Sequence, residues 1–388
     1  MGLIDSAGPM VGLARESFNI SNTMASLLPM LAYIMYGVLS VPMGLLQDKK
    51  GKKFILNLGL AIALSGLLIP IFSNMHGHMV VDRTSMMQFY KILTAILLLG
   101  AGGATLQVGG NPIIRDISKP GHYSRNLSLA QSMITVGSSM GFLLPVILLH
   151  SFGVDWSILF PVFSCIVLFS AIGLNMINIQ ERKSDDDHHA SFRSCFRLLK
   201  NRYVLIMVIG IFIYCGVEIS MSANVPLLLK EKFSISIEKM GLLISWSLFY
   251  LPILVGRFLG SIILSRIAPN RLLLITALLA LTGVLLIFSN SFSLTLFGIF
   301  LTGLGFANIF PLIFSITIDR MPEHTNELSG LMVSSIAGGA FIPLLAGLVA
   351  DATSSVQIAF IVPILCIIYL LFVAIINNRI HAKECKPN

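Results

Sequence analysis

Apolar runs of membrane-spanning length recur along the whole chain, and they limit the fold more than any other feature. A helix needs about 20 predominantly apolar residues to cross a bilayer. Runs of that length, separated by polar breaks, give twelve predicted spans at residues 1–17, 22–46, 54–72, 86–114, 125–150, 157–178, 203–229, 238–265, 271–288, 292–318, 327–350 and 356–377. Charged residues make up only 11% of the 388 residues, against about 25% in a typical soluble protein. The sequence therefore predicts an all-α polytopic membrane protein with 12 transmembrane helices.

The first predicted span is short. Only 14 residues precede Arg15 and Glu16, which corresponds to roughly 21 Å of helix against a hydrocarbon core of about 30 Å. We therefore expect the first helix to be truncated, with the true start upstream of Met1.

Positive charges in the loops predict the orientation of the spans. With both termini and every even-numbered loop assigned to the cytoplasm, the inside segments hold 19 lysines and arginines and the outside loops hold 6. Short cytoplasmic loops of membrane proteins carry such an excess. We therefore expect both termini in the cytoplasm. The loop lysines and arginines therefore explain the net charge of +8 without a nucleic-acid partner, and the sequence contains no recognisable nucleic-acid-binding motif.

The sequence indicates no metal site, cofactor or disulfide. The five cysteines are scattered without a CxxC pair, so small packing residues in apolar helices are the simplest interpretation. An acidic-then-histidine run at residues 185–189 falls in a hydrophilic loop and is most simply solvated. We find no nucleotide-binding loop, metal-ligand spacing or nucleophile motif, so an enzyme is not expected.

An internal repeat predicts two halves. The longest hydrophilic break, residues 180–202, separates two sets of six spans. The stretch RNLSLAQSMITVGSSM at 125–140 is similar to NELSGLMVSSIAGGAF at 326–341, and Pro112 and Pro311 lie 199 positions apart in the preceding spans. We expect six-helix halves at residues 1–179 and 203–378, a cytoplasmic linker at 180–202 and a cytoplasmic tail at 379–388. Such parallel repeats place a substrate site near the bilayer midplane between the halves.

The loop after the second span carries a specific motif, GLLQDKKGKK. It resembles the loop pattern of the major facilitator superfamily at every defined position, and this resemblance implies a pseudo-symmetric fold of two six-helix halves. A glycine lets two spans approach closely, and another permits a tight turn. We expect these residues to form a conformational latch: Gly44, Asp48, Lys49, Gly51, Lys52 and Lys53.

Further short motifs narrow the resemblance. The segments are NP at 111–112, RNLSLAQ at 125–131, VGRFLGSIILSRIAP at 255–269, FPLIFS at 310–315 and GGAFIPLLAGLVAD at 338–351. In this order they resemble the fucose–proton symporter family of bacteria. The resemblance implies import of a hexose or 6-deoxyhexose with protons by alternating access, in the inner membrane. A monomer in the lipid bilayer is expected.

Three ionisable residues within spans are candidates for function, because charge at membrane depth is costly. Glu218 lies deep in the seventh span, where burial favours the protonated carboxyl that proton coupling needs; a purely structural hydrogen bond is the alternative. Asp5 lies in the short first span, where the symporter family has a functional carboxylate one turn further on, near Gly8. Arg257 is grouped with the latch as a gating partner of a carboxylate, although packing near a helix end is the simpler interpretation.

Amides and aromatic rings within the spans suit a sugar, whose hydroxyls need hydrogen bonds and whose ring faces need an apolar surface. The predicted substrate-binding residues are Gln107, Asn111, Gln131, Asn224, Asn308, Tyr36, Trp246 and Phe310. Bonding between helices is the competing role for the amides, and lipid-interface anchoring for the rings. Five glycines around Gln107 further predict close helix contacts in the fourth span.

Gln107 is also a departure from the symporter family, which has a glutamate followed by the same Asn-Pro. A glutamine binds hydroxyls but carries no proton, so coupling would rest on Glu218, and an uncoupled uniporter stays an alternative. A major facilitator exporter of drugs or metabolites is the other alternative. The fifth span reads VGSSMGFLLPV and lacks the Gly-Pro-rich motif of such exporters, which favours import.

Overall fold

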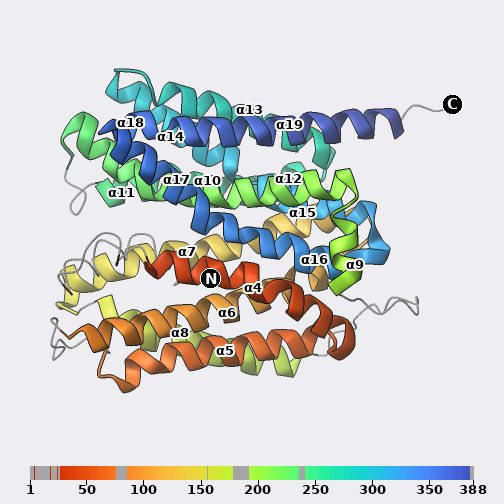
Figure 1. Cartoon of the computed structure of the whole chain (residues 1–388), viewed down its shortest axis with the longest axis horizontal. Helices are drawn as coiled ribbons and strands as arrows, with labels where there is room; N and C mark the ends of the chain where they lie inside the picture. Colours follow the sequence, from red (N-terminus) through yellow and green to blue (C-terminus); the bar gives the residue numbers. More distant parts are fainter. Residues whose placement is uncertain are drawn as a thin grey trace. The chain divides into compact units, whose positions relative to one another are not determined.

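The structure, a computed structural model, describes residues 27–75, 85–154, 156–177, 192–235 and 241–384, together with Ile4, Phe18 and Met24. Within these ranges every regular element is a helix (Figure 1). Most of the first predicted span, including Asp5, lies outside the described residues. The same is true of the acidic-then-histidine run at 185–189.

The longer helices follow the predicted spans. In chain order they are α4 (Leu27–Lys50), α5 (Lys52–Phe72), α6 (Met86–Ile117), α7 (Tyr123–Phe152), α8 (Leu159–Met176), α10 (Arg202–Phe233), α12 (Leu251–Ile263), α13 (Pro269–Leu286), α14 (Phe292–Phe306), α15 (Ile309–Arg320), α16 (Thr325–Ser334), α17 (Gly338–Thr353) and α19 (Ile361–Glu384). The short helices are α9 (Phe192–Leu198), α11 (Leu242–Ser245), α18 (Val356–Ala359), the π-helical turn η3 (Trp246–Tyr250) and the 3₁₀ turns η1 (Trp156–Ile158), η4 (Pro322–His324) and η5 (Ser335–Ala337).

Ten segments of the described chain are long and apolar enough to cross a membrane. They coincide with ten of the predicted spans, and their ends differ from the prediction by up to five residues. The predicted span 125–150 is the continuous helix α7. The prediction of a polytopic helical membrane protein is confirmed.

Four predicted spans are not continuous α-helices within the described residues, and one of them, the span 356–377, is broken at Phe360 between α18 and α19. The span 292–318 is broken between α14 and α15, at residues 307–308. The span 327–350 is divided by the 3₁₀ turn η5, and the span 238–265 contains the π-helical turn η3. These interruptions were not predicted, because apolar length indicates a span and not the hydrogen-bond pattern within it.

The chain divides into two compact units, each described by itself. Unit 1 contains Met1–Ile117, Val136–Phe196 and Glu323–Ala337; unit 2 contains Ser118–Thr135, Arg197–Pro322 and Gly338–Asn388. The beginning of α7 is therefore grouped with unit 2, and α16 is grouped with unit 1. The predicted six-helix halves follow sequence order instead, and their boundaries stay a prediction.

Unit 1 is organised around α6, which packs against both α4 and α5 (Figure 1). The glycines predicted to permit close contacts lie at these two seams. A Cβ atom on Gly100 would stand 2.3 Å from the carbonyl oxygen of Ala32 in α4. One on Gly102 would stand 2.7 Å from the backbone nitrogen of Ala63 in α5. Alanine is therefore too large at either position, and α6 meets two neighbours through bare backbone.

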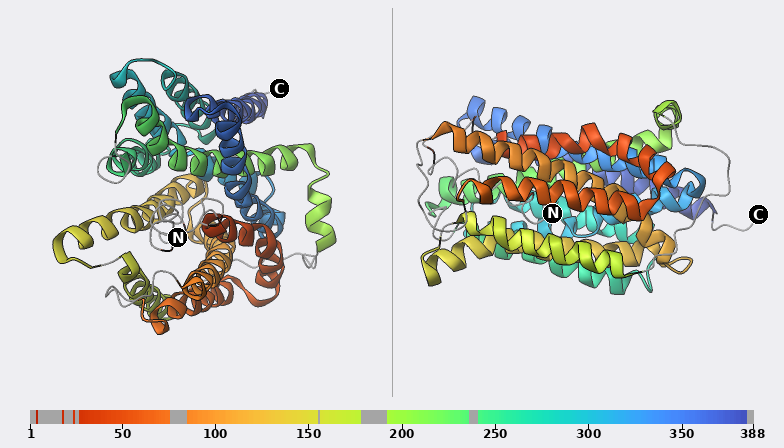
Figure 2. Two further views of the ribbon diagram at one scale, coloured as in Figure 1. Left: turned by 60° about the vertical axis from the view of Figure 1, so that its left-hand side comes forward. Right: turned by 90° about the horizontal axis from the view of Figure 1, so that it is seen from below.

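Unit 2 contains the corresponding pair α13 and α14, with α19 alongside α13 (Figure 2). Its central helix is α10, which packs against α15, α17 and α19. At the seam between α10 and α17, a Cβ atom on Gly338 would stand 1.8 Å from the carbonyl oxygen of Phe212. These contacts hold the middle of α10 next to the break between α14 and α15.

Candidate functional site

The break between α14 and α15 exposes main-chain carbonyl oxygens inside unit 2. Pro311 has no N–H, and a proline ring clashes with the carbonyl four residues earlier, here that of Ala307. Asn308 leaves helical geometry with φ −114° and ψ 0°, and α15 starts again with the bond from Leu312 N to Asn308 O at 3.0 Å. Proline is tolerated at this position because the first turn of α15 needs no donor there. The carbonyls of Phe306 and Ala307 must find other donors.

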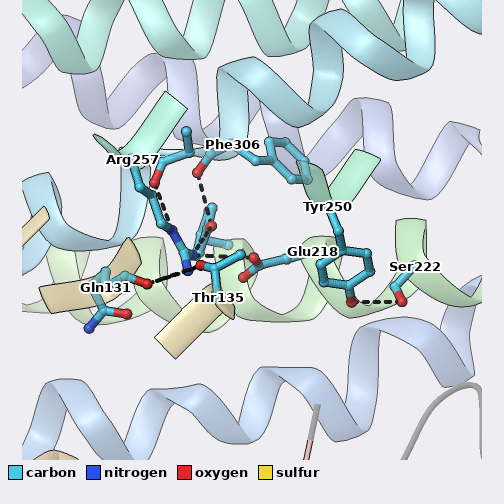
Figure 3. Close-up of polar contacts among 9 residues, drawn as sticks. Gln131, Thr135, Glu218, Ser222, Tyr250, Arg257 and Phe306 are labelled. Atoms are coloured by element: carbon cyan, nitrogen blue, oxygen red, sulfur yellow. Dashed lines mark hydrogen bonds and ion pairs between the residues drawn. The ribbon is translucent and has the colours of Figure 1, made fainter. Parts of the chain in front are cut away.

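Arg257 on α12 supplies one of these donors. Its Nε donates to the carbonyl oxygen of Ala307 at 3.0 Å (Figure 3). Its Nη1 donates to the carbonyl oxygen of Gln131 at 3.3 Å and also to the hydroxyl of Thr135, both on α7. The guanidinium is therefore inserted between α7 and the break, with 6% of the residue exposed. Arg257 lies at the middle of α12, away from both ends of that helix.

The remaining nitrogen of Arg257 faces α10. Its Nη2 lies 3.4 Å from Oε1 of Glu218 and donates to the hydroxyl of Tyr214 at 3.5 Å (Figure 3). The tyrosine hydroxyl in turn donates to the carbonyl oxygen of Phe306 at 2.9 Å. The pair is partly buried, with 8% of the Arg257 side chain and 17% of the Glu218 side chain exposed, so the loss of one partner leaves an uncompensated charge at a poorly hydrated place. Of the two interpretations of Arg257, the geometry favours the partner of a carboxylate.

Two glycines on α12 make room for the break. A Cβ atom on Gly256 would stand 2.6 Å from the Cβ of Ala307, and one on Gly260 would stand 2.3 Å from the side-chain amide of Asn308. The Asn308 amide nitrogen donates back to the carbonyl oxygen of Gly256 at 2.8 Å. Asn308 and Arg257 therefore both join α12 to the break: Asn308 donates to Gly256, and Arg257 donates to Ala307.

Unit 1 contains the repeat counterpart of this arrangement without the charge. Pro112 lies inside the continuous helix α6, so the carbonyl of Val108 has no helical donor from position 112. The hydroxyl of Ser329 on α16 donates to that carbonyl at 3.1 Å. The two matching prolines therefore have different effects. α6 continues through Pro112 with the Val108 carbonyl hydrogen-bonded, whereas the corresponding span of unit 2 is broken before Pro311.

Two of the predicted latch residues, Gly44 and Asp48, contact α16. The side-chain amide of Asn326 donates to the Asp48 carboxylate at 3.1 Å and accepts from Nε2 of Gln47 at 2.8 Å. A Cβ atom on Gly44 would stand 3.1 Å from the carbonyl oxygen of Asn326 and 3.2 Å from Cα of Gly330. We call this contact of α4 with α16 the latch seam, defined by Gly44, Gln47, Asp48, Asn326 and Gly330.

The other latch residues have separate partners. Gly51 has a φ of 88°, which is the left-handed geometry that the predicted tight turn requires. Lys52 forms a buried ion pair with Asp116 of α6. Lys53 donates to the carbonyl oxygen of Ile177 at 2.8 Å, and Lys49 is exposed. The motif therefore joins α4, α5 and α6 within unit 1, whereas Arg257 lies in unit 2 and takes no part in the latch seam.

The remaining polar candidates of unit 2 divide into two groups. Asn224 donates to the carbonyl oxygen of Ser220 at 2.8 Å, one turn earlier in its own helix. Three others bury a polar atom that has no hydrogen-bond partner among the described residues. These atoms are Nε2 of Gln131, Oδ1 of Asn308 and Nε1 of Trp246. Figure 3 shows the Gln131 side chain directed away from the guanidinium that its carbonyl oxygen binds.

Aromatic candidates lie close to this network or in the other unit. Phe310, 4% exposed, lies with its ring centroid 6.3 Å from that of Tyr214. Tyr36 is fully buried in unit 1 beside Tyr33, with 6.1 Å between ring centroids. Gln107 and Asn111 are buried on α6 in unit 1, at 8% and 3% exposure. The structure therefore brings Glu218, Arg257 and Gln131 together, and it keeps Tyr36, Gln107 and Asn111 in a separate unit.

Sequence reasoning missed two members of the network, Tyr214 and Thr135. Tyr214 precedes Glu218 by four residues, and Thr135 follows Gln131 by four. Side chains four apart share a helix face, so this spacing was an available signal. The hydrogen bond of 2.8 Å from Tyr250 to Ser222 was equally unforeseen.

Comparison with known proteins identifies the family. Residues 2–332 and 206–387 match the family model described as Major Facilitator Superfamily. The chain is 24% identical to a glucose/galactose transporter of Brucella abortus, covering 94% of this chain and 88% of the relative. It is 22% identical to the L-fucose-proton symporter of Escherichia coli, covering 91% and 84%. The crystal structure of FucP in the outward conformation aligns with a TM-score of 0.78 at 20% identity, over 97% of this chain and 96% of that one.

The family match spans the chain from residue 2 to residue 387, and the fold agrees with that of a solved transporter over nearly its full length. These relatives are membrane transporters and not enzymes. The chain belongs to the Major Facilitator Superfamily.

Proposed function

We propose that this protein is a secondary active transporter that imports a sugar together with a proton by alternating access. Relatives that cover most of the chain are named glucose/galactose transporter and L-fucose-proton symporter, which supports a hexose or 6-deoxyhexose as substrate. The residues of unit 2 add chemical support of their own.

The observation that carries the proposal is the set of buried polar atoms without partners in unit 2. A buried polar group that makes no hydrogen bond costs about 1–3 kcal/mol, so native proteins rarely keep several without a use. Gln131 and Trp246 offer N–H donors, and Asn308 offers an acceptor. Sugar hydroxyls both donate and accept, so a bound sugar matches this mixture of groups.

Glu218 is the proposed proton carrier. Its side chain lies against the Arg257 guanidinium and is 17% exposed, so the carboxyl is mostly removed from solvent but a proton can still reach it. A carboxyl that exchanges between an ion pair and a protonated state can couple proton entry to a change of conformation. Gln107 stands at the position where the symporter family has a glutamate, so it is assigned to substrate and not to protons.

The latch seam is the proposed gate on one side. It packs α4 on α16 through two glycines, Gly44 and Gly330, and the bridging amide of Asn326. With both termini in the cytoplasm, as the loop charges predict, this seam lies on the cytoplasmic side. The protein is proposed to act as a monomer in a bacterial inner membrane.

A substrate screen tests the proposal. Purified protein in liposomes is assayed for uptake of radiolabelled D-glucose, D-galactose, D-mannose and L-fucose, with an amphipathic cation such as ethidium as the contrasting probe. We expect saturable uptake of at least one sugar and none of the cation. Transport of the cation alone would support the exporter alternative and overturn the proposal.

A further inference from the structure

The guanidinium of Arg257 touches two features that are otherwise separate, the Glu218 carboxylate and the carbonyl that Pro311 leaves without a helical donor. The contact to the carbonyl of Ala307 is the shorter, at 3.0 Å from Nε, and the contact to Glu218 is longer, at 3.4 Å from Nη2. One planar cation is therefore shared between a charge and a helix break (Figure 3).

We propose that Arg257 ties the protonation state of Glu218 to the break between α14 and α15, as a positioning residue for the coupling step. This inference rests on the proposed role of Glu218 as the proton carrier. When Glu218 is charged, the guanidinium is held from both sides. When Glu218 accepts a proton, the attraction on Nη2 falls, and the guanidinium is held mainly by Ala307 and Thr135.

The sharing follows from geometry. The five N–H donors of an arginine lie in one rigid plane, so the group cannot move toward the carboxylate without moving away from the carbonyl. A proton on Glu218 therefore changes how firmly the carbonyls of Phe306 and Ala307 are satisfied. Tyr214 carries the same signal by a second route, because its hydroxyl contacts Nη2 and donates to Phe306.

Two titratable groups contact Glu218 in the described structure. Tyr214 of α10 interacts with it electrostatically, and Arg257 of α12 pairs with it. From α7 and the break, the described contacts are neutral: the Gln131 carbonyl, the Thr135 hydroxyl and two main-chain carbonyls.

The other helices that pack on α10 place their ionisable residues elsewhere. Asp351 of α17 is exposed, and Tyr369 of α19 donates to the carbonyl of Ile206, three turns before Glu218. At the end of α15, Asp319 is exposed and Arg320 lies over the ring of Tyr203 at the start of α10. The described parts of α11 and α18 contain no ionisable side chain. Among these contacts, the cation that pairs with Glu218 is Arg257.

The proline gives a way to disturb the sharing without removing a charge. Pro311→Ala restores an N–H at position 311, which can bond to the Ala307 carbonyl and close the helix. The guanidinium then loses its competing acceptor and pairs more closely with Glu218, so the carboxyl should protonate only at lower pH. Arg257→Gln removes the cation, so the carboxyl should protonate at higher pH.

Infrared difference spectroscopy of the full chain in lipid measures this directly. The carbonyl stretch of the protonated Glu218 carboxyl is followed across a pH titration and is assigned by its loss in Glu218→Gln. We expect the midpoint to rise by about one pH unit or more in Arg257→Gln, and to fall by about one in Pro311→Ala. Pro112→Ala is the matched control, because the carbonyl that Pro112 leaves without a helical donor accepts from the neutral Ser329 hydroxyl, and the midpoint of this variant should equal that of the wild type.

A wild-type midpoint in Pro311→Ala would overturn the proposal, as would an equal shift in Pro112→Ala. The titration needs no substrate, so its outcome is independent of which sugar is carried. If Glu218→Gln keeps proton-linked uptake, the role of Glu218 as the proton carrier fails while the titration result stands. If Glu218→Gln loses coupling but the Pro311 and Arg257 variants titrate like the wild type, only this inference fails.

Discussion

The side-chain amide of Asn326 donates a hydrogen bond of 3.1 Å to the carboxylate of Asp48, across 278 positions of the sequence. The same side chain accepts a hydrogen bond from Gln47, so Asn326 of α16 binds two residues near the end of α4. Hydrogen bonds to a charged group contribute about 1.5–3 kcal/mol.

Removing either side of this bond should weaken the latch seam. We expect Asp48→Ala and Asn326→Ala each to slow uptake, and the double variant Asp48→Ala/Asn326→Ala to be little worse than either alone. A double-mutant cycle on uptake rates in liposomes measures the coupling between them, with about 1.5 kcal/mol expected. Additive effects of the two changes would show that the bond carries no coupling.

Bulk at Gly44 should hold the latch seam apart. Its Cβ would stand 3.1 Å from the Asn326 carbonyl oxygen, and a valine adds two further methyl groups against that surface. Overpacking costs about 1–3 kcal/mol, so Gly44→Val should slow uptake by about tenfold or more. Gly173→Val is the control, because nothing lies within 4 Å of that position. Equal slowing in both variants would contradict a steric role for Gly44.

A methyl group at Gly260 should disturb the break instead. The new Cβ would stand 2.3 Å from the Asn308 side chain and displace the amide that donates to Gly256. We expect Gly260→Ala to lower the free energy of unfolding by about 1–3 kcal/mol. Thermal unfolding of purified protein in one detergent measures this against Gly347→Ala, a position with nothing within 4 Å. An unchanged melting temperature in Gly260→Ala would mean that the break tolerates repacking.

How far the sequence predicts this molecule depends on whether a property is local. The glycines around Gln107 and the turn at Gly51 were predictable, because close approach and positive φ are demands on a single residue. The break between α14 and α15 was not. Pro112 and Pro311 occupy matching places in the predicted repeat, yet α6 continues through the first, whereas α14 ends at Phe306 before the second.

The difference between the two prolines comes from the neighbours. The Val108 carbonyl meets a serine hydroxyl, whereas the Ala307 carbonyl meets a guanidinium that α12 brings close through Gly256. Such a partner lies 50 positions away in sequence, and no spacing rule reveals it. The Asn326 amide as the donor to Asp48 of the latch motif was missed for the same reason.

The thiol of Cys195 on α9 should react slowly with maleimide at neutral pH. Burial, together with the nearby Glu327 carboxylate, raises the pKa of the Cys195 thiol to about 11 from an ordinary 9.0, and the residue is 1% exposed. The thiolate is the reactive form, so at neutral pH its fraction is about 100-fold below that of an ordinary thiol. The rate of maleimide labelling should therefore keep rising with pH up to about 11, beyond the pH at which an ordinary thiol levels off.

The labelling is measured in a chain whose other cysteines are replaced by serine; these are Cys165, Cys215, Cys366 and Cys385. Phe196→Cys in a Cys195→Ser background supplies the control, because Phe196 is the next residue and is 59% exposed. Equal labelling rates at the two positions would show that Cys195 is neither buried nor shifted.

The central claim is that Glu218 couples sugar uptake to protons, and accumulation against a gradient tests it most directly. Liposomes containing wild type or Glu218→Gln receive an inward proton gradient and a sugar identified in the substrate screen. We predict that the wild type accumulates the sugar above the external concentration, whereas Glu218→Gln exchanges sugar and only equilibrates it. Accumulation that persists in Glu218→Gln, or a wild type that equilibrates with or without the gradient, would contradict the account.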